Sequence, residues 1–137
     1  MRYLYKIICL SLFLTTIHLS AQTQSNYTLK SNQVSIFEKN KTLTSSLIKV
    51  GNTLKWLQKE QGTSHTIEYT ITNITGNWDA STSRGHLTYS LSKSGFTTVT
   101  FSLIGTENDG IEAILSVQEG ENPALAYTFN ITNITYP

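Results

Sequence analysis

Four side chains in this sequence could take part in acid–base chemistry or metal binding: His65, Glu68, Asp79 and His86. Two histidines and one carboxylate are the smallest set that holds a metal ion or a hydrolytic water. His65 and His86 lie before and after the segment around Trp78, so they would meet if their strands paired. The chain has no His-x-x-x-His, Gly-x-Ser-x-Gly or glycine-rich phosphate motif. His65, His86 and Asp79 therefore form an alternative, enzymatic site, and the sequence predicts neither a cofactor nor a bound metal ion.

The segment from Gly76 to Gly85 is polar, and we interpret it as a loop that carries a binding surface. An exposed aromatic ring beside polar groups can stack on a sugar or anchor a protein partner. We expect Trp78 to be this anchor, with Asn77, Asp79 and Arg84 as its polar partners. The other interpretation is a residue that folds back over an open edge of the core.

Two further patterns have simpler interpretations than ligand binding. The run Glu107-Asn108-Asp109-Gly110 resembles part of a calcium loop, but Gly105 and Ser116 stand where the first and last acidic ligands belong. Asp-Gly between alternating segments favours a hairpin turn instead. Threonines recur on the expected outward face and could form a flat binding surface, but threonine also has high strand propensity and tolerates water.

The elements that must position these residues are mostly strands. From His86 to Tyr136, apolar and polar residues alternate in four runs that turn residues interrupt. A period of two is typical of half-buried strands, since successive side chains point to opposite faces. The same alternation predicts a strand over Thr66–Ile74 and shorter strands over Tyr27–Lys30 and Gln33–Glu38. The central inward residues, which we expect in the core, are Phe101, Leu115 and Phe129.

The segment from Lys41 to Gln61 has a different spacing. Its apolar residues recur at the gaps of four and three that are typical of a helix, namely Leu43, Leu47, Val50, Leu54 and Leu57. Gly51 would end such a helix, so we predict a short helix over Thr42–Val50 and a strand over Thr53–Gln58. Two alternatives remain open: one helix that continues to Gln61, and a hairpin that turns at Gly51-Asn52.

A sheet with one apolar face needs a cover, and the short helix can supply it. The predicted fold class is therefore α+β, an antiparallel meander with one short helix packed on its apolar face. The alternative is an all-β barrel or sandwich.

The first residues have the composition of an export signal. Arg2 and Lys6 precede an apolar run, and the small residues of Leu19-Ser20-Ala21 follow it. This order predicts a cleaved signal peptide over residues 1–21, because the apolar run is too short to span a membrane. A polar lead-in over residues 22–26 and a single β-rich domain over residues 27–137 would then follow.

Cleavage would remove Cys9, which is the only cysteine of the 137 residues, so the exported domain would contain no disulfide. It would also change the formal charge from +1 to −1 by removing Arg2 and Lys6. A nearly neutral domain has no electrostatic footprint for nucleic acid. The sequence therefore predicts a secreted or periplasmic protein that contacts no nucleic acid and has no membrane span.

The order of the segments also resembles a known group of proteins. The features that carry the resemblance are the export signal ending in Ala21-Gln22, the strand start Asn32-Gln33-Val34, the helix that ends at Gly51, the meander, and the closing run from Tyr127 to Ile134. In this order they resemble small secreted Bacteroidota domains of unknown function with a TATA-binding-protein-like fold. The segment from Gly76 to Ser94 departs from that pattern. The resemblance implies a fold and an exported location, and it implies no activity.

No nucleophile has a recognisable context, and the acidic residues are scattered over turns and polar strand faces. We therefore predict a non-enzymatic binding or interaction protein of the cell envelope or extracellular space, with a protein or glycan partner. The alternatives are a small hydrolase or metal-dependent enzyme, and an inhibitor or structural envelope component. The sequence leaves the oligomeric state open.

Overall fold

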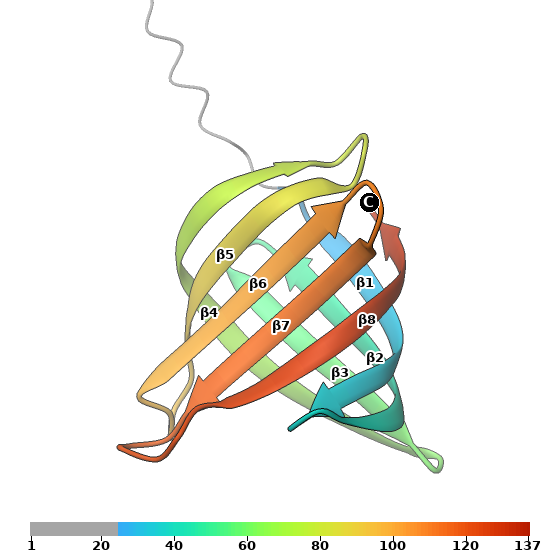
Figure 1. Ribbon diagram of the computed structural model, residues 1–137. Helices are drawn as coiled ribbons and strands as arrows, with labels where there is room; N and C mark the ends of the chain where they lie inside the picture. The colour runs from blue at the N-terminus through green and yellow to red at the C-terminus, as the bar shows by residue number, and fades with distance from the viewer. Residues whose placement is uncertain (1–24) are drawn as a thin grey trace, which may run out of the picture.

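The computed structural model describes residues 25–137, which form eight antiparallel strands and no helix. The signal peptide expected over residues 1–21 lies outside the described residues. The strands are β1 (Tyr27–Ile36), β2 (Lys39–Val50), β3 (Thr53–Glu60), β4 (Thr63–Asp79), β5 (Arg84–Ser92), β6 (Thr98–Thr106), β7 (Gly110–Gln118) and β8 (Leu125–Thr135). Each strand pairs with the next, and β1 pairs with β8, so the sheet is a closed barrel (Figure 1).

Side chains from all eight strands fill the interior of the barrel. Phe101, Leu115 and Phe129 have no exposed surface, which confirms the sequence prediction for these core residues. The ring of Trp56 packs edge-on against Tyr127 and Phe129, with both pairs of centroids 5.0 Å apart. An eight-stranded barrel is just wide enough for side chains to fill it, and here apolar and aromatic residues do so.

The prediction of an α+β fold with a helix over Thr42–Val50 is wrong. These residues belong to β2, and a tight turn at Gly51-Asn52 connects them to β3, with Val50 paired to Thr53. The observed arrangement is the all-β barrel with a hairpin at Gly51-Asn52, the alternatives that the sequence leaves open. Because residues 25–137 contain no helix and their sheet closes on itself, these residues do not form the TATA-binding-protein-like fold implied by the resemblance.

The helical spacing misleads because two inward positions of β2 are polar. Leu43, Ser45, Leu47 and Lys49 all face the interior and are buried, in the period of two expected for a strand. Ser45 is accommodated there because its hydroxyl accepts a hydrogen bond of 3.1 Å from the indole N–H of Trp56. Val50, which completed the apparent helical stripe, is 58% exposed.

The two ends of the barrel differ in what they carry. The connections β2–β3, β4–β5 and β6–β7 lie at the same end as both ends of the described chain, and we call this the terminal end (Figure 1). The connections β1–β2, β3–β4, β5–β6 and β7–β8 lie at the other end, which we call the hairpin end. Thr28 pairs with Thr135, so the first and last strands meet at the terminal end.

Strand β4 is unusual because its two halves have different neighbours. Its first half pairs with β3, from Thr63 to Thr70, and its second half pairs with β5, from Thr70 to Asp79. The β3–β4 hairpin therefore extends past the end of β5, with the turn at Gln61-Gly62 as its tip (Figure 1).

Candidate functional site

The predicted loop from Gly76 to Gly85 is mostly strand. β4 continues to Asp79 and β5 begins at Arg84, so only residues 80–83 form the turn. Asn77 is an exposed residue of β4 that pairs with His86. The polar composition suggested a loop because the outward positions here are polar and two of the inward positions are glycine.

Trp78 faces into the terminal end of the barrel. Its indole N–H donates a hydrogen bond of 2.9 Å to the hydroxyl of Tyr136, which follows β8. The ring also lies over Gly105 of β6, where an added Cβ atom would come within 2.7 Å of the indole Cη2. Trp78 therefore spans the barrel from β4 to the end of β8 and packs against the core. Little of its ring remains available to anchor a ligand.

Asp79 and Arg84 each have a partner other than Trp78. The carboxylate of Asp79 accepts hydrogen bonds from the hydroxyl and the backbone N–H of Ser81, at 2.6 and 2.9 Å. The hydroxyl bond, followed by the backbone bond, lowers the pKa of Asp79 below its usual value. Arg84 forms an exposed ion pair of 3.6 Å with Glu107. These contacts stabilise two turns of the terminal end.

The three residues of the alternative enzymatic site lie apart. His65 is exposed near the tip of the β3–β4 hairpin, and Asp79 ends the same strand fourteen residues later, at the opposite end of the barrel. That separation is roughly 45 Å of strand at about 3.3 Å per residue. His86 pairs with Asn77 near the terminal end. The structure thus does not bring His65, His86 and Asp79 together in a pocket.

Among residues 25–137, no group of three or more His, Cys, Asp or Glu side chains is placed to hold a metal ion. The residues that resembled a calcium loop form the turn between β6 and β7, with Thr106 paired to Gly110. The backbone N–H of Asp109 donates a hydrogen bond of 3.0 Å to the hydroxyl of Thr106. The hairpin interpretation of this motif is confirmed.

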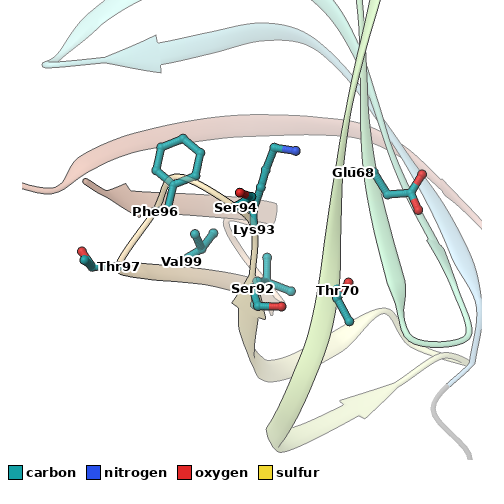
Figure 2. A pocket seen from close by; sticks show the side chains of 9 residues that line it. Glu68, Thr70, Ser92, Lys93, Ser94, Phe96, Thr97 and Val99 are labelled. Carbon is teal, nitrogen blue, oxygen red and sulfur yellow. The ribbon is translucent and has the colours of Figure 1, made fainter. Parts of the chain in front are cut away.

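A hollow of about 440 Å³ lies where β4 and β5 separate, and we call it the β4 groove. Figure 2 shows Glu68 and Thr70 on one side and the segment that carries Ser92, Lys93 and Phe96 on the other. The groove exists because β5 ends at Ser92, while β4 extends toward the hairpin end without it. It combines a strand edge with apolar and charged side chains, as surfaces that bind extended peptides do.

The two charged side chains that line the β4 groove, Glu68 and Lys93, each contact a neighbouring residue. The carboxylate of Glu68 forms an exposed ion pair of 3.6 Å with Lys55 of β3, and in Figure 2 it points away from Lys93. The amino group of Lys93 lies 5.9 Å from the centre of the Tyr69 ring. Ser94 is exposed and Phe96 is partly buried against the core. No sequence motif marks these residues, since the groove arises from the stagger between strands.

The described part of the chain has no helix of the length and apolarity needed to cross a membrane. The chain matches no protein-family model, no curated protein and no solved structure.

Proposed function

We propose that this protein is a non-enzymatic binding or interaction protein, exported to the cell envelope or the extracellular space, and that the β4 groove is its contact surface. The observation that carries the proposal is the strand edge of β4 that borders this groove, beside the partly buried ring of Phe96. A rigid scaffold with a shaped edge is sufficient for binding, and it needs no catalytic group.

Two observations favour this surface over the one expected from sequence. Trp78 packs across the terminal end and contacts Gly105 and Tyr136, so its ring serves the core. The enzymatic alternative requires His65, His86 and Asp79 to converge, and the strand geometry separates them. The β4 groove, in contrast, is open to solvent and lies at the side of the barrel toward the hairpin end.

A pull-down from an envelope extract of the native host tests this proposal. Ser94 is exposed and lines the groove, so Ser94→Arg should obstruct it without removing a core contact. We expect wild-type protein to retain partners that Ser94→Arg loses. The matched control is Ser90→Arg, which changes an exposed serine on the outer face of β5 away from the groove. Identical partner sets for all three proteins would contradict the β4 groove as the contact surface.

A further inference from the structure

One edge of β4 has no strand beside it. From Thr63 to Tyr69, β4 pairs only with β3, and no other strand of residues 25–137 pairs with this half of it. In Figure 2 the strand that carries Glu68 and Thr70 borders the β4 groove along this edge. An unpaired strand edge presents backbone N–H and C=O groups in the spacing that another strand can match.

The register identifies the residues whose backbone groups point outward. Opposed residues of an antiparallel pair alternate between those that bond each other and those whose N–H and C=O groups point away. Glu60 and Thr63 close the two-residue turn, and the N–H of Ile71 bonds the C=O of Asn52 at 2.7 Å, which fixes the phase of this alternation. Three residues therefore direct both backbone groups toward the free edge: Ser64, Thr66 and Glu68.

This edge lacks the features that usually prevent strand pairing. Proteins protect exposed edges with lysine, proline or a bulge. The segment from Thr63 to Tyr69 contains no lysine or proline, and the bulge of β4 lies beyond it, between Ile71 and Asn73. Its one charged carboxylate, on Glu68, already forms an ion pair with Lys55.

We propose that a second copy of this chain occupies the edge, by antiparallel pairing of the two β4 strands around a two-fold axis at Thr66. This inference rests on the proposed function, because it assigns the occupant of the β4 groove. The pairing places Thr66 opposite Thr66 of the second copy and Ser64 opposite its Glu68. All three outward-pointing residues then bond, which gives six N–H···O=C hydrogen bonds, and no like charges face each other.

The β4 groove provides the room that this pairing needs. With Ser64 of the second copy beside Glu68, the hairpin tip of that copy, Gln61-Gly62, comes level with Thr70. Ser92 already pairs with Thr70, so the tip must bend away from the strand edge into the groove. There the chain turns away after Ser92 and leaves a hollow of about 440 Å³. The tip has no large side chain at Gly62. The interface is isologous, so it closes as a dimer.

A cysteine cross-link tests the register of this dimer. In a chain that also carries Cys9→Ser, the substitution Thr66→Cys supplies the only thiol. Directly opposed residues that bond each other have Cα atoms about 5.5 Å apart, within the range of a disulfide. We expect mild oxidation to link Thr66→Cys into dimers. The matched control is Thr75→Cys, exposed on the half of β4 that pairs with β5, which should stay monomeric. Equal cross-linking of the two variants, or none, would overturn the proposal.

A second measurement uses the association constant of the purified protein. Thr66→Pro removes one edge N–H from each copy, and these groups make no bond within the barrel. We expect it to weaken dimerisation about tenfold or more in analytical ultracentrifugation, whereas Thr66→Ala keeps the N–H and the dimer. Melting temperatures of the variants verify that they fold. A wild-type protein that stays monomeric overturns this inference, and a loss of partners in Ser94→Arg would still support the proposed function.

Discussion

The hydroxyls of Tyr27 and Tyr89 meet inside the barrel, 2.9 Å apart, and both rings are almost fully buried. Burial, followed by the neighbouring phenol, raises the pKa of Tyr27 well above its usual value, and burial raises the pKa of Tyr89 to about 12. The folded protein therefore holds these protons more strongly than the unfolded chain, in which tyrosine has a pKa of about 10. The stability that both phenols contribute is complete below about pH 10, and the contribution of Tyr89 is lost as the pH rises toward about 12.

We thus expect the free energy of unfolding to decrease between about pH 10 and about pH 12, by on the order of 2–3 kcal/mol for Tyr89, and Tyr27 adds a decrease in the same direction. Urea unfolding at several pH values measures this decrease. The control is Tyr89→Phe, which removes one of the titrating groups and should flatten the curve. A free energy that is constant over this pH range in the wild-type protein would contradict the prediction.

Neighbouring residues of β6 should differ widely in their contribution to stability. Phe101 has no exposed surface and stacks on Tyr89, with centroids 5.6 Å apart, whereas Thr100 lies on the outer face. Replacing a buried phenylalanine with alanine typically costs about 3–5 kcal/mol. We therefore expect Phe101→Ala to lower the melting temperature much more than Thr100→Ala in thermal unfolding. Equal melting temperatures would mean that the two faces of β6 are reversed.

At the scale of elements, the terminal end depends on a cross-barrel contact between strands far apart in sequence. Trp78 of β4 bonds Tyr136 after β8 and covers Gly105 of β6. Since Trp78 is only partly exposed, we expect Trp78→Ala to cost about 2–3 kcal/mol, somewhat less than a fully buried aromatic residue. Chemical denaturation measures this loss.

The hydrogen bond can be separated from the packing of the ring. Tyr136→Phe removes the acceptor hydroxyl and leaves both rings, so it should cost only about 1 kcal/mol, as typical hydrogen bonds do. If Trp78→Ala were as stable as Tyr136→Phe, the indole ring would not be closing the barrel.

The strands with regular alternation, β5, β6 and β7, could be predicted from sequence. Their buried inward side chains, such as Leu87, Phe101 and Leu115, are apolar. β2 could not, because its inward residues include Ser45 and Lys49, and the outward Val50 supplied a false helical spacing. What makes a polar residue acceptable inside is its partner, and the bond between Ser45 and Trp56 joins two strands. A pattern within one strand does not contain that information.

The β4 groove could not be predicted from the sequence for a related reason. Whether Thr66 has a neighbour on both sides depends on where β5 ends relative to β4, and this stagger is a property of the closed sheet. For Trp78, the sequence suggested a binding site where the structure has a packing contact. A tryptophan among polar residues resembles a binding anchor, but the ring of Trp78 contacts Gly105 and Tyr136.

At the scale of the whole molecule, the two ends of the described chain lie together, because β1 and β8 are neighbours and Thr28 pairs with Thr135. We expect a circular permutant to fold when a short linker joins Pro137 to Asn26 and the chain is opened at the exposed β6–β7 turn. Far-ultraviolet circular dichroism should show strand without a helical component, and unfolding should remain cooperative.

A chain that ends before Leu125 serves as the contrast to the permutant. It lacks β8, so β1 and β7 each lose a neighbour and the interior opens to water. We expect this truncated protein not to unfold cooperatively. A truncated protein as stable as the full chain would show that closure of the barrel contributes nothing.

The pairing of the first strand with the last also means that the barrel cannot close until synthesis of the chain is nearly complete. Tyr27 leaves the ribosome about a hundred residues before Leu125. At about 5–20 residues per second, several seconds or more pass before β8, the second neighbour of β1, has been synthesised. Throughout that interval the nascent chain exposes apolar strand faces and open edges that its own later residues will cover. Until the last strand has emerged, the growing chain can therefore pair with strands of other chains instead of with its own.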